Sequence, residues 1–370
     1  MAKRIVDESN LIAVADAIRG KSGGSDSLVF PDGFVTAIEG ISADGGNSDD
    51  FEWFNDGNTH IWITLQEGRT SPKLGVCPNG TVTVDWGDGT APDVLTGTSL
   101  SATKYTPVHE YTSAGDYIIT LVIDGEMRID GSILRHSTNQ TYANAPYCAA
   151  IKAMEFDNKV TFGGNNPFSF CASVSKIKLQ DGSYYFYSTR SSGFGGCSSL
   201  AHINIPDSVR SIPESCFSGC ASLSEITFPN SVTSIGERVF YNCSSLSSFI
   251  FPDEITTVDK YSFYSCNALS SITLSSNTAT ISFGAFSGCR SLVTVKFPKT
   301  LTSIQSEAFY RCYSVRCYDF TSCSSVPELS NVSAFTDIPS DCEIRVPAAL
   351  YDEWIAATNW STYASQIVAV

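Results

Sequence analysis

The sequence predicts a mainly β protein whose second half is a solenoid of 23-residue coils. The first observation is a column of cysteines that lie 23 residues apart: Cys197, Cys220, Cys243, Cys266, Cys289 and Cys312. Cys148 and Cys171 have the same spacing, and only the step from Cys171 to Cys197 differs, at 26 residues. The second observation is that apolar residues recur at fixed offsets from these cysteines. A fixed period of this length is typical of stacked repeats.

Each coil is predicted to form two short strands and a turn. From Cys197 to Phe217 the pattern is Cys-x-x-Leu-x-x-Ile-x-Ile-Pro-x-x-Val-x-x-Ile-x4-Phe, and the four following coils keep its register. The run Leu-x-x-Ile-x-Ile alternates and is β-branched, which favours a strand. Proline ends this strand because it cannot donate to a central ladder. The run Val-x-x-Ile then returns the chain. The coil that starts at Cys266 lacks the proline.

The cysteines are predicted to be buried, reduced thiols that pack as small apolar side chains. Disulfide frameworks have irregular spacings, whereas a fixed period indicates one cysteine per structural repeat. The nearest approach to a CxxC metal or redox pair is Cys216-x3-Cys220, so core packing is the preferred interpretation. A single coil buries too little apolar surface to offset the entropy of ordering it, so the coils are expected to be stable only as a stack.

This pattern resembles the BspA-type leucine-rich repeat. The resemblance covers residues 148–312, with two looser coils before Cys197 that lack the proline and a three-residue insertion within residues 181–196. Proteins of this family are commonly surface adhesins or ligand-binding modules, and the repeat itself is not catalytic. We assign the leucine-rich-repeat solenoid to residues 148–323.

Both ends of the array are expected to carry a cap, because a solenoid needs an atypical terminal unit to cover its open edge. Residues 125–147 are the predicted N-terminal cap, and residues 324–370 are the predicted C-terminal cap. In the latter, a strand that ends at Val346 and a short helix that bears Trp354 suit this purpose.

The segment 51–124 carries three marks of a second domain. A Gly-Asp-Gly turn at residues 87–89 follows the alternating run Val82–Trp86, His109-Glu110-Tyr111 comes next, and Gly115-Asp116-Tyr117 opens a strand pattern. These marks resemble the PKD type of immunoglobulin-like β-sandwich, although Trp86 stands where such domains often have phenylalanine. The resemblance implies a spacer or adhesion module with His109 in its core.

Residues 1–41 predict two short amphipathic helices, and residues 42–50 predict a flexible acidic linker. The first helix places Leu11, Val14 and Ile18 on one face. Two helices of this size bury too little surface to fold alone. We therefore expect this helical attachment segment to bind another protein or a second copy of the chain, giving a homo-oligomer.

This segment contains two motifs, Leu11-Ile12-Ala13-x-Ala15-Asp16-Ala17-Ile18-Arg19 and, after it, Phe30-Pro31-Asp32-Gly33. Together they resemble the N-terminus of tail-associated or minor structural proteins of phages of Gram-positive gut bacteria. The resemblance implies virion or tail proteins as partners. It also implies a virion location after assembly in the host cytoplasm, which accounts for the lack of a secretory signal. A bacterial cell surface is the alternative location.

Composition argues against two kinds of partner. The formal net charge is −15 at pH 7 and no basic cluster is present, so nucleic acid is not expected to bind. No apolar run reaches about 18 residues, so insertion into a membrane is not expected either.

The residues point to no catalytic centre, metal site or cofactor. The four histidines form no ligand array, and no nucleophile elbow, P-loop or dinucleotide motif occurs. Asp85, Asp88 and Asp93 offer oxygen ligands for calcium, but a tight turn explains Gly87-Asp88-Gly89 better. We therefore predict a non-enzymatic protein.

Tyrosines are the candidate ligand-binding residues. The position after the repeat phenylalanine holds Tyr241, Tyr264 and Tyr310, and the insertion adds Tyr184, Tyr185 and Tyr187. Stacked coils would bring such amphipathic rings into one patch suited to sugars or proteins. The alternative is that the rings only cover the edges of the coils.

Two kinds of function follow from these features. The first is a virion-associated adhesion or receptor-binding protein that recognises a host-surface glycan or protein through the solenoid, with a bacterial cell-surface adhesin as its variant. The second is a purely structural virion decoration or spacer protein without a dedicated ligand.

Overall fold

The computed structural model describes residues 53–67, 70–100, 105–135, 150–163, 168, 171–181 and 193–370. The chain divides into two compact units, residues 1–51 and 52–370, and all described residues lie in the second. The predicted attachment segment, the linker and Cys148 lie outside the described residues. So do the insertion tyrosines Tyr184, Tyr185 and Tyr187.

Long antiparallel strands build the first part of the second unit. They are β1 (Thr59–Leu65), β2 (Lys73–Asp85), β3 (Asp93–Thr98) and β4 (Gly115–Arg135), in the order β3-β2-β4-β1. Alternating β-branched and aliphatic residues such as Val82 and Val84 are buried on one face of this sheet, as the period of two requires. The PKD-type sandwich stays a prediction.

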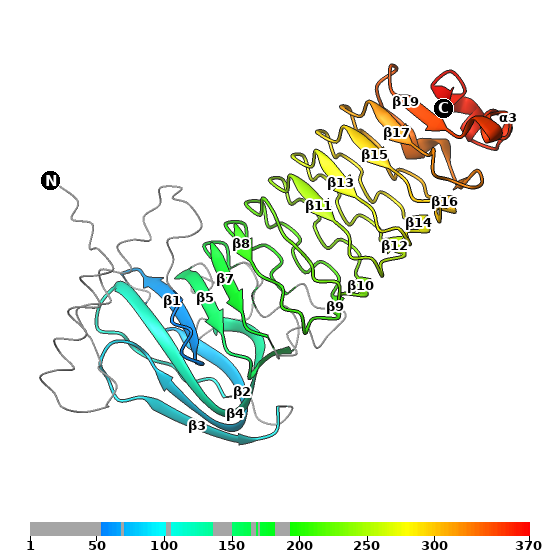
Figure 1. The fold of residues 1–370 in the computed structure, drawn as a ribbon. Helices are drawn as coiled ribbons and strands as arrows, with labels where there is room; N and C mark the ends of the chain where they lie inside the picture. Colours follow the sequence, from blue (N-terminus) through cyan, green and yellow to red (C-terminus); the bar gives the residue numbers. More distant parts are fainter. Residues whose placement is uncertain are drawn as a thin grey trace, which may run out of the picture. The chain divides into compact units, whose positions relative to one another are not determined.

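The sheet does not end at β1. Strand β1 pairs antiparallel with β5 (Ile151–Phe156), and β5, β7 (Lys176–Leu179) and β8 (His202–Ile203) continue in parallel, while β6 (Val160–Gly163) pairs with β4. One sheet therefore runs from the N-terminal strands into the first coils (Figure 1). Strand β4 crosses residue 124, where the sequence analysis placed the end of the first domain.

The register of this sheet confirms that the two looser coils belong to the stack. Ala153 in β5 pairs with Lys176 in β7, one 23-residue period later. Lys176 in turn pairs with His202, so the three extra residues of the insertion leave the ladder in register.

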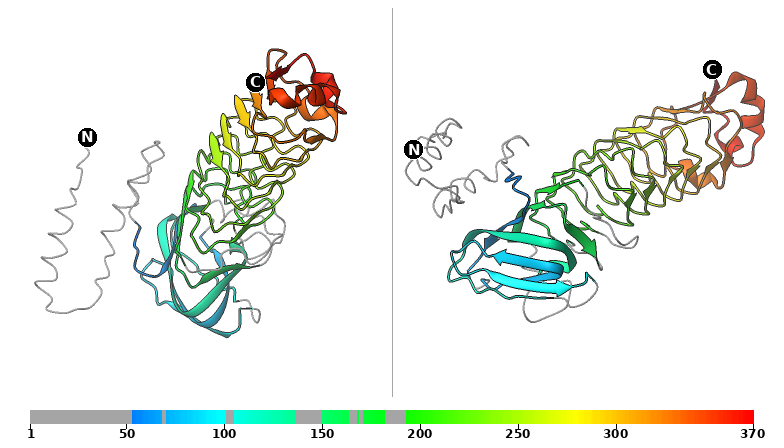
Figure 2. Two further views of the ribbon diagram at one scale, coloured as in Figure 1. Left: turned by 45° about the vertical axis from the view of Figure 1, so that its right-hand side comes forward. Right: turned by 60° about the horizontal axis from the view of Figure 1, so that its bottom comes forward.

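Two parallel ladders follow along the solenoid (Figures 1 and 2). One contains β11 (Ser248–Ile250), β13 (Ser271–Thr273), β15 (Thr294–Lys296), β17 (Cys317–Asp319), β19 (Glu343–Val346) and β20 (Ile367–Ala369). The return strands pair as β9 (Ser211–Ile212) with β10 (Ser234–Ile235), and as β12 (Thr257–Val258), β14 (Thr280–Ile281), β16 (Ser303–Ile304) and β18 (Glu328–Leu329). The two predicted strands are present in the coils that start at Cys197, Cys243, Cys266 and Cys289. The coil that starts at Cys220 differs from the prediction, because only its return strand β10 forms.

Columns of identical side chains fill the solenoid core. The repeat phenylalanines stack from coil to coil, with Phe263, Phe286 and Phe309 at centroid distances of 5.3 and 5.2 Å. The cysteine column from Cys197 to Cys312 is fully buried and free. Each coil adds the same buried set, so stacking supplies the core that one coil lacks.

The turn after the return strand contains two residues with left-handed backbone. They recur with the period, as in Tyr261 and Ser265 with φ of 56° and 58°. The N–H of the second one donates to a carbonyl of the next coil, for example from Asn242 to Tyr264 over 2.8 Å. This turn leaves the position after the repeat phenylalanine partly exposed in the coils that hold Ser218, Tyr241, Tyr264 and Tyr310, whereas Ser287 is buried there.

The C-terminal residues close the array. After β19 come the short helices η4 (Ala348–Leu350), α3 (Tyr351–Ala356) and η5 (Trp360–Tyr363), while η3 (Val332–Phe335) precedes it. Trp354 and Trp360 are buried against Phe320, with centroids at 4.9 and 5.4 Å. The indole N–H of Trp360 donates to the Pro327 carbonyl over 2.8 Å. These rings cover the apolar core beyond the last repeat phenylalanine.

Candidate binding surface

The candidate tyrosines lie on one turn of the coils, and two of them are in contact. The rings of Tyr241 and Tyr264 stack with centroids 4.8 Å apart and planes 7° apart. Both side chains are partly exposed. Tyr310 lies two coils beyond Tyr264. The coil between them has Ser287 at this position, and Ser287 is only 3% exposed.

Two further aromatic rings extend the stacked pair. Tyr261 meets Tyr264 edge to face at 5.7 Å, and Phe283 meets Tyr261 at 5.2 Å. Tyr261 lies over Gly284, where an added Cβ would come within 2.8 Å of the ring. We call Tyr241, Tyr261, Tyr264 and Phe283 the aromatic flank.

A cation and two carboxylates border the aromatic flank. The guanidinium of Arg238 lies 5.3 Å from the centre of the Tyr261 ring. Its Nη1 atom also lies 3.3 Å from Glu214 and 3.6 Å from Glu237. These side chains are about half exposed, so the ion pairs contribute little stability. They supply polar groups beside flat rings, a combination that suits polyhydroxyl or protein ligands.

Tyr310 belongs to a smaller neighbouring group. The Arg311 guanidinium lies 4.8 Å from the centre of the Tyr310 ring, and Arg290 lies 6.0 Å from that of Tyr313. Tyr313 is 47% exposed. The aromatic surface is therefore interrupted at Ser287 and resumes one coil later.

Tyr261 and Phe283 were not predicted from the sequence as part of this surface. Both precede the repeat phenylalanine in their coils, at positions that hold no aromatic residue elsewhere in the five regular coils. The usable signal was Gly284, a single glycine in a column that otherwise holds Ser215, Arg238, Tyr261 and Glu307. A missing side chain there leaves room for the ring on the preceding coil.

The cysteine column offers no reactive thiolate. Each thiol donates to the carbonyl of a phenylalanine from an earlier coil, as from Cys243 to Phe217 over 3.1 Å. Burial raises the pKa of Cys243 and of Cys312 to about 12. Burial likewise raises the pKa of Cys216 and Cys220, the pair with the closest sequence spacing. Thiols kept protonated and buried are poor nucleophiles and poor metal ligands.

The carboxylates of the Gly-Asp-Gly turn already have partners. Asp88 accepts hydrogen bonds from Thr90 and lies 2.7 Å from Nε2 of His109. Burial raises the pKa of Asp88, but these hydrogen bonds outweigh it and hold the pKa below its ordinary value. Asp93 accepts from the Trp86 indole over 2.9 Å. In the described part of the chain, no group of three or more His, Cys, Asp or Glu side chains could hold a metal ion.

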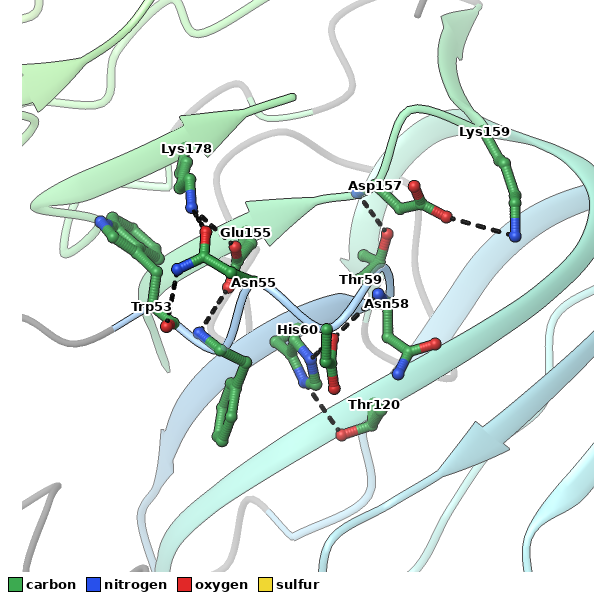
Figure 3. A network of polar contacts seen from close by, with 12 residues as sticks. Trp53, Asn55, Asn58, Thr59, His60, Thr120, Glu155, Asp157, Lys159 and Lys178 are labelled. Atoms are coloured by element: carbon green, nitrogen blue, oxygen red, sulfur yellow. Dashed lines mark hydrogen bonds and ion pairs between the residues drawn. The ribbon is translucent and has the colours of Figure 1, made fainter. Parts of the chain in front are cut away.

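A buried ion pair joins β5 to β7, beside the pairing of β5 with β1 (Figure 3). The side chain of Glu155 is fully buried and lies 3.1 Å from Nζ of Lys178. Glu155 also accepts from the backbone N–H of Phe54 over 3.0 Å, and Lys178 donates to Asn55. Lys178 further lies 5.8 Å from the centre of a Trp53 ring. These contacts fix residues 53–55 against the first coils.

Aromatic packing supports the same corner. His60 is buried between Phe54 and Trp62, with centroids at 4.3 and 5.9 Å. Its ring nitrogens lie 2.9 Å from Asp56 and 3.1 Å from Thr120 (Figure 3). The polar groups of this corner bond to one another. The corner therefore acts as a structural joint between the N-terminal strands and the first coils.

The fold and this surface define a class of protein, namely a β-solenoid repeat protein with a partly exposed aromatic flank. The family model for the BspA type leucine-rich repeat region, in six copies, matches residues 132–191 and 187–316, which together span half of the chain. The chain therefore belongs to the BspA-type leucine-rich repeat family, and the resemblance inferred from the sequence is confirmed.

Solved structures of leucine-rich repeat proteins are among those similar to this chain. A leucine-rich repeat protein from Bacteroides ovatus is 20% identical, covers 59% of this chain and 66% of its own, and has a TM-score of 0.36. The leucine-rich repeat protein of T. pallidum is 23% identical over 51% of this chain and 79% of its own, with a TM-score of 0.37. A leucine-rich cell surface protein from Faecalibacterium prausnitzii is 17% identical over 68% and 88%, with a TM-score of 0.25.

A comparison with curated proteins found no match. Among the described residues, no helix is long and apolar enough to cross a membrane.

Proposed function

We propose that this protein is a non-enzymatic adhesion or receptor-binding module that contacts a host-surface glycan or protein through its solenoid. The observation that carries the proposal is the stacked pair Tyr241 and Tyr264 with Tyr261 beside it. The coils do not need these rings, because Ser218 and Ser287 occupy the position of Tyr241 in other coils. Partly exposed rings without a role in the core are typical of binding surfaces.

We further propose that the module is carried on a phage virion, with residues 1–41 bound to virion or tail proteins. The support is the resemblance of the N-terminal phrase to phage structural proteins. A bacterial cell-surface adhesin is the variant of this proposal. In either setting, the PKD-like segment 51–124 would hold the solenoid away from its point of attachment.

The test replaces the three tyrosines of the repeat position with serine, as Tyr241→Ser, Tyr264→Ser and Tyr310→Ser in one chain. Because serine already occurs at this position in two coils, the melting temperature should change little. Binding to host cells or to a glycan array should weaken by at least about tenfold, equivalent to about 1.4 kcal/mol. A matched control replaces Val94 and Val122, which are exposed but lie outside the solenoid, and should keep binding.

A second candidate function is a structural spacer. The observation that favours it is the single sheet that runs from β3 into the first coils, since a shared sheet joins two parts rigidly. If the triple variant keeps binding but loses stability, the tyrosines cover coil edges and the spacer function stands. If wild-type protein binds no host surface at all, the adhesion proposal is wrong.

A further inference from the structure

The coil that lacks the proline has a hollow at the corner that follows its first strand, β13. In the neighbouring coils this corner is Phe251-Pro252 and Phe297-Pro298, whereas here it is Leu274-Ser275. Ser275 is 2% exposed, and its hydroxyl donates to the Asp253 carbonyl over 2.6 Å. A smaller side chain replaces phenylalanine, and a hollow of about 510 Å³ lies at this corner.

The floor of the hollow is apolar and its rim is polar. Leu274, Phe297 and Pro298 form the apolar part, while Thr273 and Ser276 bring hydroxyl groups. Phe297 is held from below, because it stacks on Phe320 with centroids 4.1 Å apart. This open hollow offers an apolar floor and a few polar groups at its rim, in a space large enough for one sugar ring.

Two unpaired lysines complete the lining, Lys296 and Lys299. Neither has an ion-pair or hydrogen-bond partner within residues 193–370, the continuous part that the structure describes. Every other lysine and arginine of that part contacts a carboxylate, a backbone carbonyl or an aromatic ring. In a chain with a net charge of −15, two free cations at one hollow are a local exception.

The carboxylate that pairs with Lys296 across the ladder makes no ion pair with it. Asp319 pairs with Lys296 in the ladder between β15 and β17. Its Oδ1 atom accepts from the backbone N–H and the hydroxyl of Thr321, over 2.9 and 2.6 Å. Its carboxylate is turned toward Thr321, so the ammonium groups remain available for a ligand.

We infer that this hollow is a second binding site, separate from the aromatic flank, and that it takes a carboxylate-bearing sugar. The apolar face of the sugar ring would lie on Leu274 and Pro298, which are partly exposed, and its hydroxyls would meet Thr273 and Ser276. Its carboxylate would lie between Lys296 and Lys299. A sugar acid fits better than inorganic phosphate, because phosphate has no apolar face to cover the floor.

The test is calorimetric titration of the full chain with an oligogalacturonate and with its methyl ester, which is the same sugar without the charge. The acid should bind at least about tenfold more tightly than the ester. The variant Lys296→Gln/Lys299→Gln should lose that preference without losing stability, because both side chains are exposed and unpaired. Lys260→Gln, at an exposed lysine paired with Glu237, is the matched control and should bind as wild type.

A second variant tests the shape of the hollow. Leu274→Phe restores the residue of the neighbouring coils and should fill the floor, so oligogalacturonate should bind at least about tenfold more weakly at an unchanged melting temperature. Equal binding of acid and ester, or unchanged binding in both variants, overturns the inference. Displacement of the sugar by an equal concentration of inorganic phosphate overturns the sugar assignment. The triple tyrosine variant should keep this binding, so failure of the adhesion proposal is distinguished from failure of this one.

Discussion

At the scale of single residues, the joint between the N-terminal strands and the first coils depends on a buried charge. Glu155 has no exposed side-chain surface, and Lys178 is 25% exposed. Removing one partner of such a pair leaves an uncompensated buried charge, which costs about 3–5 kcal/mol. Because the lysine is partly exposed and Glu155 accepts an additional hydrogen bond from Phe54, we expect the cost to lie at the lower end of this range.

We therefore predict that Lys178→Met lowers the free energy of unfolding by about 3 kcal/mol, measured by urea denaturation. Methionine keeps the packing of the lysine stem and removes the ammonium group with its contacts to Glu155, Asn55 and Trp53. The double variant Glu155→Gln/Lys178→Met should recover most of the loss, because no buried charge remains. A double variant as unstable as the single one would show that packing, and not charge, holds this joint.

At the scale of the element, the cysteine column makes the stack sensitive to alkali. In the folded solenoid, burial raises the pKa of Cys243 and Cys312 to about 12, from an ordinary value of 9.0. Between these values the unfolded chain has lost thiol protons that the folded chain still holds. The stabilising contribution is fully present below pH 9.0 and falls as the pH rises, by up to about 1.4 kcal/mol per thiol and pH unit.

The measurement is the free energy of unfolding at about pH 8 and about pH 10. Wild-type protein should lose stability over this range, and Cys243→Ala/Cys312→Ala should lose less, because two of the titrating thiols are gone. Comparing the two slopes removes the packing cost of the alanines, which is present at both pH values. A slope as steep in the variant as in wild type would exclude the thiols as the cause.

At the scale of the whole molecule, the chain consists of two compact units that divide near residue 51. The second unit is internally continuous, since one sheet links β3 to β8 through β1 and β5. Its core extends without interruption to Trp354 and Trp360. The fold of this unit should therefore be independent of the first 47 residues.

We predict that deletion of residues 1–47 leaves a soluble protein with the melting temperature of the full chain, measured by calorimetry. The same deletion should abolish incorporation into virions, or self-association in the purified protein, measured by sedimentation. Retained assembly would mean that attachment resides in another part of the chain. A truncated chain that melts without cooperativity would mean that the two units depend on each other.

The sequence by itself determined the period, the inward cysteines and the two strands of most coils, the coil that starts at Cys220 being the exception. Each coil contacts chiefly its neighbours, so a local 23-residue pattern contains nearly all the information needed to stack it. The same regularity pointed to the tyrosine position after the repeat phenylalanine, and the fold places Tyr241 and Tyr264 in contact there.

Only the tertiary structure decided which features meet across coils or across the two parts of the sheet. The pairing of β1 with β5 joins residues about 90 positions apart, and no periodicity encodes it. Tyr261 over Gly284, and Lys296 with Lys299 beside Leu274, likewise depend on what the adjacent coil lacks. A repeat pattern shows which residues the coils share. The proposed binding surfaces lie where neighbouring coils differ, and their form depends on side-chain contacts between those coils.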